Sequence, residues 1–162
     1  MADAVKGRTE KRAARRTGDA GKRTEYLAFR LDGDVYAVQI AHVAEILKPP
    51  PITVVPRAPR TVLGVISVRG KLVTVVDLRR RFHLPEAPND RRTRILLADV
   101  GSGEQVGLLV DEVQQVWRLG PEEIEAAHVL GAEQPPHIAG VGRPAQGTLL
   151  ILLDLRPIVE LP

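Results

Sequence analysis

The sequence predicts a mainly β protein with short helices, built from two similar halves of about five strands each. Three observations support this prediction. Short apolar runs rich in Val, Ile and Leu recur along the chain, 13 prolines and 14 glycines fall mostly between them, and two sequence patterns occur twice in the same order. Turn residues between short apolar runs favour strands over long helices. At 162 residues, the chain is long enough for one ordinary domain with a hydrophobic core.

The first two strands are expected on either side of Asp32-Gly33. Residues 27–31 and 36–40 carry apolar side chains at every second position, a period that predicts half-buried strands. Asp-Gly is favoured in tight hairpin turns because both residues tolerate positive φ. In residues 42–47 the apolar positions have helical spacing instead. We therefore expect one or two helical turns there, ending at the prolines 49–51.

A second hairpin follows an extended stretch. Two β-branched runs, 62–68 and 72–76, flank the expected turn Arg69-Gly70-Lys71. Asp77 then precedes an expected short helix at residues 78–82. A carboxylate in this position can accept hydrogen bonds from the free N–H groups of the first helical turn, so Asp77 is predicted to be a structural cap.

The second half of the chain repeats this order of elements. After a polar connection (84–92), the expected elements are a hairpin of strands 95–100 and 105–110 continued by 113–119, a helical turn at 121–124, a strand at 148–153 and a terminal helical segment at 154–161. Asp154 lies at the start of this last segment and is predicted to cap it, as Asp77 does in the first half. The Gly- and Pro-rich sequence before residue 147 is left without a predicted strand.

Two matches within the sequence indicate an internal duplication. Residues 36–47 match residues 106–117 in apolar pattern at an offset of 70, and residues 73–79 match residues 150–156, including Asp-Leu-Arg, at an offset of 77. Both matches keep the same order, which favours duplication over chance. The halves are then roughly residues 26–83 and 95–160. Each can form a small barrel without exposed sheet edges, and the groove between them is the expected partner site.

The first residues have a different composition. Eight of the 23 Lys and Arg residues lie within residues 1–25, against four of the 20 acidic residues, so the rest of the chain is nearly neutral. With almost no large apolar side chains, residues 1–24 cannot offset the entropy of ordering and are predicted to be a disordered basic tail before a domain at 25–162. A solubilising role is favoured over an arm that binds nucleic acid or acidic lipid.

No catalytic residue, metal site or cofactor is predicted. The chain has no cysteine, which excludes disulfides and thiolate chemistry, and its four histidines lack the spacing of metal ligands. No apolar stretch approaches the roughly 20 residues of a membrane-spanning helix, and the N-terminus lacks the apolar core of a secretory signal. A cytoplasmic location is the simplest expectation.

Residues 64–79, which read GVISVRGKLVTVVDLR, resemble the CheW family of chemotaxis coupling proteins. That family typically has Gly-x-x-Asn-x-Arg-Gly, an apolar strand and then Asp-Leu. Residues 36–47, 106–117 and 149–156 support the match, so the resemblance covers about residues 24–160. It implies two intertwined five-stranded SH3-like barrels and a non-enzymatic scaffold.

The resemblance also implies two partners. One is the cytoplasmic signalling tip of a chemoreceptor (a methyl-accepting chemotaxis protein), and the other is the regulatory domain of a CheA-type histidine kinase. The family's receptor-facing arginine falls on Arg69, and neighbouring contacts on the first short helix fall on Val43 and Glu45, with Ile46 alongside. Taken without the resemblance, Arg69 reads as a solvated hairpin residue and Val43 as a core residue. The protein is then expected to be recruited to receptor arrays without inserting into the membrane.

One residue departs from the family pattern: Ser67 stands where asparagine is usual, and serine has a single donor where the amide has two. Two other functions remain open. The chain could be a CheW-like adaptor of another two-component pathway, or a nucleic-acid-binding barrel with a basic arm. The second is disfavoured because only 3% of the residues are aromatic, and single-strand binders use aromatic side chains as stacking platforms.

Overall fold

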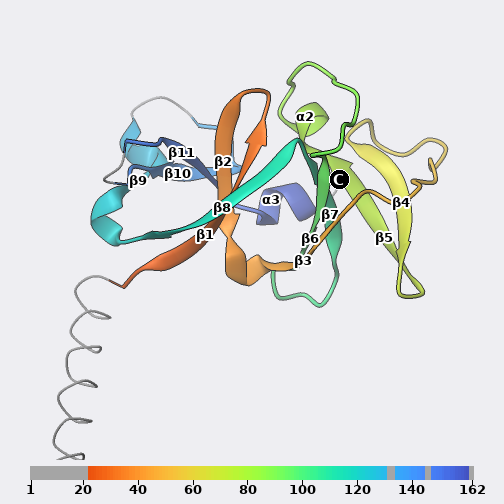
Figure 1. Ribbon diagram of the computed structural model, residues 1–162, viewed down its shortest axis with the longest axis horizontal. Coiled ribbons are helices and arrows are strands. Elements are labelled where there is room, and N and C mark those ends of the chain that lie inside the picture. Colours follow the sequence, from red (N-terminus) through yellow and green to blue (C-terminus); the bar gives the residue numbers. More distant parts are fainter. Residues whose placement is uncertain (1–21, 131–133, 145–146, 161–162) are drawn as a thin grey trace, which may run out of the picture.

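The structure, a computed structural model, describes residues 22–130, 134–144 and 147–160. Its strands form two sheets (Figure 1), which confirms the mainly β prediction. Sheet A contains, in spatial order, β8 (Glu112–Leu119), β1 (Thr24–Leu31), β2 (Asp34–Gln39), β11 (Leu150–Leu153), β10 (Ile138–Gly142) and β9 (Ile124–Ala126). Sheet B contains, in spatial order, β3 (Val43–Leu47), β6 (Arg94–Ala98), β7 (Val106–Val110), β5 (Lys71–Asp77) and β4 (Val62–Val68).

The helical segments within the described residues are each about one turn long. They are α2 (Leu78–Arg81), α3 (Arg156–Val159) and the 3₁₀ segments η1 (Ile40–His42), η2 (Pro121–Glu123) and η3 (Ala127–Leu130). Asp77 is the N-cap of α2, and its side chain accepts a hydrogen bond of 2.9 Å from the N–H of Arg79. Asp154 accepts the corresponding bond, 3.1 Å, from the N–H of Arg156. The residue directly before α3 is nevertheless Leu155, so Asp154 lies one position earlier relative to its helix than Asp77 does.

Each sheet combines strands from both halves of the sequence. From the first half, β1 and β2 belong to sheet A, whereas β3, β4 and β5 belong to sheet B. The second half does the opposite, since β6 and β7 belong to sheet B and the later strands to sheet A. Two parallel pairs, β2–β11 and β5–β7, join the halves within each sheet. The two halves are therefore intertwined.

The strand registers confirm the internal duplication. In the β5–β7 pair, Thr74 lies opposite Val106, and in the β11–β2 pair, Ile151 lies opposite Tyr36. Ile151 follows Thr74 by 77 positions, and Val106 follows Tyr36 by 70 positions. These are the two offsets of the repeated sequence patterns. The two sheets therefore have the same parallel register at equivalent positions.

Two glycines are equivalent through their strand partners, since Gly64 lies opposite Val75 and Gly140 lies opposite Leu152, 77 positions after Val75. Gly64 and Gly140 each follow a register shift, in β4 and β10 respectively. A Cβ at Gly64 would lie 2.1 Å from the carbonyl oxygen of Thr53, and a Cβ at Gly140 would lie 2.3 Å from that of Glu125. Such distances exclude any side chain. Thr53 forms an isolated bridge with Val65, which corresponds to the pairing of β9 with β10.

The main core lies between the two sheets. It includes Leu27 and Phe29 from sheet A, Leu96 and Leu108 from sheet B, and Ile158 from α3, all buried. Because the chain has few aromatic residues, aliphatic side chains fill most of this space. The exception is a row of stacked rings that spans the joint between the halves. Its centroid distances are 6.2, 5.6 and 4.3 Å in the order Phe29, Tyr36, Phe82, His137.

The helical prediction for residues 42–47 was wrong. Only η1 at Ile40–His42 is helical, and β3 follows at Val43–Leu47. The β3–β6 register shifts between Val43 and Glu45, so Val43 lies opposite Ala98 and Ile46 lies opposite Leu96. A bulge adds one residue to a strand and changes a spacing of two into a spacing of three. The apolar spacing that indicated a helix comes from a bulged strand.

The other differences lie near the C-terminal end. Strands β9 and β10 occupy the Gly- and Pro-rich sequence for which no strand was predicted, and α3 is shorter than the predicted segment 154–161. The greater part of the predicted tail, residues 1–21, lies outside the described residues. At its end, the guanidinium of Arg23 donates hydrogen bonds to the carbonyl oxygen of Arg118 (3.1 Å) and to Glu123 (2.8 Å).

Candidate functional site

Three of the predicted receptor-contact residues, Val43, Glu45 and Ile46, lie on β3, which is one edge strand of sheet B. Arg69 lies at the tip of the β4–β5 hairpin, and β4 is the other edge strand of the same sheet. The guanidinium of Arg69 donates to both carboxylate oxygens of Glu45, through a bond of 3.3 Å from Nη1 to Oε1 and a second bond from Nη2 to Oε2. This bidentate pair therefore connects the two edges of sheet B.

The backbone at the hairpin tip is the reason Arg69 reaches this position. Arg69 and Gly70 have φ of +50° and +82°, the combination required by the two-residue hairpin turn with positive φ at both central positions. Asn, Asp and Gly are the usual residues there, because other side chains crowd the backbone in this conformation. An arginine held in such a turn is a reason to look for a role in binding.

The ion pair stays largely accessible to solvent. The Arg69 side chain is 74% exposed and that of Glu45 is 32% exposed. The hydrogen bond from Arg69 lowers the pKa of Glu45 below its ordinary value, and the same bond raises the pKa of Arg69. Both groups are therefore charged at neutral pH. The carboxylate orients the guanidinium, which keeps donors available to a partner.

Val43 and Ile46 lie on the other face of β3. Their cross-strand neighbours Ala98 and Leu96 belong to the core between the sheets, whereas Leu97, opposite Glu45, belongs to the separate cluster inside sheet B. Val43 is half-buried against that main core, so it contributes to packing as well. Ile46 is 44% exposed. The structure thus brings the four predicted residues together as two pairs on opposite faces of one edge strand.

Sequence reasoning missed an exposed apolar residue beside this site. Leu72, on β5, is 76% exposed and lies opposite Ser67 in the hairpin that carries Arg69. Its equivalent at the offset of 77, Leu149, is 55% exposed. The sequence does have an apolar residue at this position in both copies, which could have indicated an exposed contact. Periodicity alone assigns such a residue to the core.

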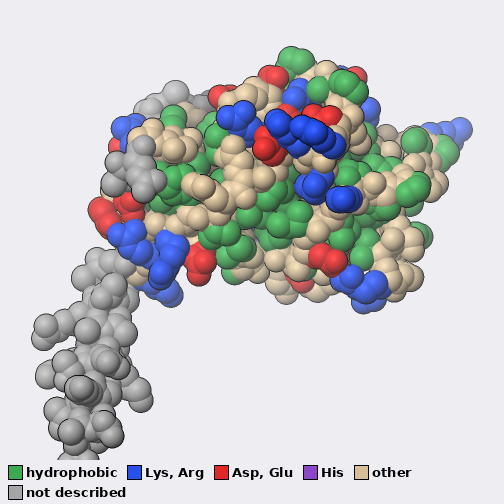
Figure 2. All heavy atoms as spheres, in the orientation of Figure 1, with side chains coloured by type: hydrophobic (Ala, Val, Ile, Leu, Met, Phe, Trp, Pro, Cys, Tyr) green, Lys and Arg blue, Asp and Glu red, His purple; other side chains and the backbone are tan. Residues whose placement is uncertain are grey.

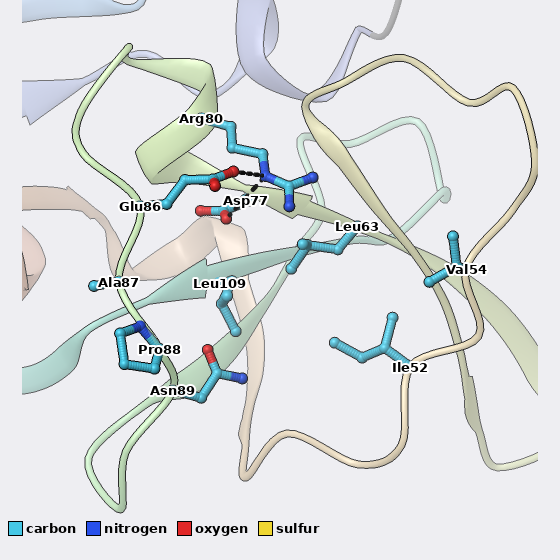
Figure 3. Close-up of a pocket in the computed structure, with 10 residues that line it drawn as sticks. All are labelled: Ile52, Val54, Leu63, Asp77, Arg80, Glu86, Ala87, Pro88, Asn89 and Leu109. Carbon is cyan, nitrogen blue, oxygen red and sulfur yellow. Dashed lines mark hydrogen bonds and ion pairs between the residues drawn. The ribbon is translucent and has the colours of Figure 1, made fainter.

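A second surface lies at the opposite end of the β4–β5 hairpin. A groove of about 520 Å³ lies there. Figure 3 shows Ile52, Val54, Leu63 and Leu109 among the residues around it. Arg80 lies at its charged end, where Nε donates to Glu86 at 2.7 Å and lies 3.7 Å from Asp77. Val54 is 74% exposed. An accessible apolar surface beside oriented charges is a suitable contact for a protein partner.

Arg79 was not among the residues predicted to have a functional role. Its side chain joins distant parts of the chain. Its guanidinium donates to both oxygens of Asp111 at 2.8 and 2.6 Å and to the carbonyl oxygen of Pro85 at 2.7 Å. The N–H of Asp32 donates to Asp111 as well, at 2.9 Å. Burial by itself would raise the pKa of Asp111, but the bonds from Arg79 and Asp32 lower it overall. This network holds the β1–β2 turn against α2 and the start of β8.

His137 differs from the other histidines because it is buried, with 8% of its surface exposed. Its Nδ1 has no hydrogen-bond partner among the described residues. Burial lowers its pKa, and the nearby Arg81 and His83 lower it further. Within residues 22–130, 134–144 and 147–160, no group of three His, Asp or Glu side chains could hold a metal ion, and no helix has the length and apolar character to cross a membrane.

These features define a class of protein: a duplicated β module with accessible charged and apolar side chains around the edges of one sheet. The CheW-like domain family matches residues 25–161, and the chain belongs to this family. It is 32% identical to the chemotaxis protein CheW of Rhizobium meliloti over 143 residues, which cover 88% of this chain and 90% of that protein. It is 30% identical to the protein FrzA of Myxococcus xanthus over 117 residues, 72% of each chain.

A solved structure of the family has the same fold. The scaffolding protein TtCheW from Thermoanaerobacter tengcongensis superimposes with a TM-score of 0.78 at 26% sequence identity. The superposition covers 86% of this chain and 94% of TtCheW. The intertwined arrangement of the two sheets is therefore that of a known scaffold protein.

Proposed function

We propose that this protein is a non-enzymatic adaptor that couples chemoreceptors to a CheA-type histidine kinase. It acts in the cytoplasm and is recruited to receptor arrays, where receptor state controls the kinase. The observation that carries the proposal is the bidentate pair between Arg69 and Glu45 at the edge of sheet B, in a chain of the CheW-like family. Relatives named as chemotaxis proteins and a relative named as a scaffold support it.

The receptor side of the proposal uses β3 and the hairpin tip. Arg69 offers guanidinium donors to polar groups of the receptor, and Ile46 offers an exposed apolar side chain for its helical surface. Arginine is enriched in protein interfaces because its planar group makes several directed hydrogen bonds. Val43 supports Ile46 from the same face of β3. Glu45 keeps Arg69 oriented and gives the site a charge preference.

The kinase side uses the groove near Val54. An adaptor must hold two partners at once, so their surfaces have to be separate. The groove includes Asp77 at one end of β5, whereas Arg69 lies just before Lys71 at the other end. Six residue steps in a strand span roughly 20 Å. The kinase regulatory domain is proposed to contact the apolar groove residues, with Arg80 and Glu86 at the rim.

The receptor assignment can be tested by replacing Arg69. Arg69→Ala is expected to weaken capture of a receptor signalling domain from the same organism at least tenfold, because it removes the exposed donors. Lys71→Ala is the matched control, since Lys71 is an exposed cation two residues away with no ion pair within the described residues. Capture of the kinase regulatory domain by both variants should stay unchanged. Equal receptor binding by wild type and Arg69→Ala would reject the site.

An adaptor role in another two-component pathway is the second candidate. The relative FrzA carries a different name from the chemotaxis proteins, so the family includes proteins with other designations. The neighbouring genes would separate the two candidates, because a chemotaxis adaptor is expected beside receptor and kinase genes. Binding of nucleic acid through the basic tail is less supported. It predicts salt-sensitive binding that disappears when residues 1–24 are removed.

A further inference from the structure

A group of arginines surrounds a shallow hollow where the two sheets meet. Arg91, Arg92 and Arg94 line it together with Glu112 and Val113, and its volume is about 330 Å³. We call this feature the arginine hollow. Arg30 adds a fourth guanidinium, because it lies opposite Glu112 in the β1–β8 pair and directly opposed residues point to the same face of a sheet.

Few acidic groups balance these charges. The nearest ion pair of Arg92 is a distant one, 3.9 Å from Nη1 to Glu112, and the Arg92 side chain is 58% exposed. Among the residues that the structure describes, Arg30 and Arg91 form no ion pair. Asp90, which precedes Arg91 in the chain, accepts a hydrogen bond from the backbone N–H of Arg92. The lining of the hollow thus contains three guanidinium groups and one carboxylate, that of Glu112.

The arginine hollow is held in place by its own backbone. Arg94 donates from Nη1 to the carbonyl oxygens of Arg91 and Thr93, both at 2.8 Å. These bonds fix the turn that presents Arg91 and Arg92. Like charges this close repel one another, and a rigid turn prevents them from moving apart. An anion from a partner would relieve this repulsion, and bidentate guanidinium groups are well suited to carboxylates.

The register of sheet B connects this hollow to the proposed receptor site. Ile46 lies opposite Leu96 in the β3–β6 pair, and Arg94 is two residues before Leu96 on the same face of β6. Diagonal neighbours of this kind have side chains about 7–8 Å apart. Ile46, which is exposed at the edge of the sheet, and Arg94 are therefore close enough for one partner to contact both. Figure 2 shows Lys and Arg side chains gathered where the β1–β2 turn, α2 and the following loop meet in Figure 1.

We propose that the arginine hollow binds acidic side chains of the same receptor signalling domain that contacts Ile46. This inference rests on the proposed function and specifies the chemistry of the partner: an apolar contact for Ile46 flanked by Asp or Glu residues. The hollow supplies charge-assisted hydrogen bonds and steers the partner during association. Arg69 then contacts the receptor from the face of β3 that carries Glu45. The arginine hollow contacts it near the opposite face, which carries Ile46.

The first test uses a fluorescently labelled octaglutamate peptide and measures its binding to the full chain by anisotropy at low salt. Arg91→Glu combined with Arg92→Glu is expected to weaken binding at least tenfold. The matched control combines Arg57→Glu with Arg118→Glu, two exposed arginines outside the hollow, and changes the net charge equally. Glu112→Gln removes a competing carboxylate and is expected to tighten binding about twofold to threefold. Equal weakening in both double variants would show an effect of net charge only and overturn the inference.

The second test measures binding of the receptor signalling domain by the same variants, after circular dichroism has verified that they are folded. The hollow variant is expected to bind at least tenfold more weakly than the control, and the difference should shrink as salt rises. If Arg69→Ala weakens receptor binding but the hollow variant does not, the inference fails and the proposed function stands. If neither substitution changes receptor binding, the proposed receptor site itself fails.

Discussion

The two copies of the duplicated unit agree in backbone and differ in charge. Gly64 and Gly140 occupy equivalent positions after equivalent register shifts. The exposed apolar residues recur as well: Ile46 and Val116 are 44% and 41% exposed. The charged partner does not recur, since the residue 70 positions after Glu45 is Gln115. The glycines and the exposed apolar residues thus recur in both copies, whereas the Glu45 carboxylate that pairs with Arg69 occurs only in the first.

The partly buried network of Arg79 shows the same contrast. Arg79 makes a bidentate pair with Asp111, whereas its equivalent Arg156 is exposed, and the residue equivalent to Asp111 is Ala41. The arginine of the repeated Asp-Leu-Arg pattern therefore has two different roles in one chain. A repeated motif identifies an equivalent position in the fold but does not establish an equivalent function.

The largest expected effect tests the shared backbone. Gly64→Ala and Gly140→Ala should each lower the free energy of unfolding by about 3 kcal/mol, because the added Cβ would overlap a backbone carbonyl. Gly33→Ala is the control. Its Cβ would meet no atom within 4 Å, so only the positive φ opposes it, at a cost of about 1 kcal/mol. Chemical denaturation measures all three. A loss at Gly140 no greater than that at Gly33 would contradict the equivalence of the two glycines.

The next effect tests the network found in one copy only. Arg79→Ala leaves Asp111 without its guanidinium partner and should destabilise the fold by about 2 kcal/mol. Arg156→Ala, at the equivalent position, should change stability by less than about 0.5 kcal/mol, because Arg156 is exposed. Thermal and urea unfolding of both variants provide the comparison. Similar losses would mean that the two arginines are interchangeable.

A smaller effect concerns pH. Because the pKa of His137 is lowered in the folded state from 6.5, the unfolded chain takes up the proton first as pH falls. The stability contributed by neutral His137 is therefore complete above pH 6.5 and decreases below it. The melting temperature should be lower at pH 5 than at pH 7, and His137→Phe should reduce this difference. His128→Gln, a change at an exposed histidine, should leave the difference intact.

The smallest expected effect is on the stability contributed by the exposed ion pair. Glu45→Gln should leave the melting temperature within experimental error, since exposed pairs contribute little to folding. Binding of the receptor signalling domain should nevertheless fall, because Arg69 loses the group that orients it. Gln115→Glu, the reciprocal change in the other copy, should alter neither property. A clear loss of stability in Glu45→Gln would mean that the pair stabilises the contact between the edges of sheet B rather than serving binding.

The sequence predicted the strands where apolar residues alternated, as in β1, or formed a β-branched run, as in β5. It failed at β3 because the bulge between Val43 and Glu45 gives a strand the apolar spacing of a helix. It also missed β10, whose strand includes Gly140 and Gly142 and lacks the usual β-branched pattern. In both cases, pairing with a distant strand decides the local structure.

The candidate site was predictable only in part. Arg69 and Glu45 came from family resemblance, and nothing local indicates that two residues 24 positions apart form a pair. The partner of Arg79 lies 32 residues away and depends on the bend between β7 and β8. The arginine hollow depends on Arg30 lying opposite Glu112 across two strands far apart in sequence. Contacts between residues so far apart in sequence follow from the topology of the sheets, and local sequence patterns carry no information about that topology.

The exchange of strands between the sheets has a consequence for how the chain assembles. β2 cannot complete its parallel pair until β11, near the other end of the sequence, has been synthesised. Contacts between such distant segments make folding slow, so an incomplete chain exposes an unpaired strand edge for longer than most small domains do. The same exchange means that a cut in the loop between α2 and β6 leaves no complete sheet in either fragment. The two fragments should each be unfolded alone and recover the fold when mixed.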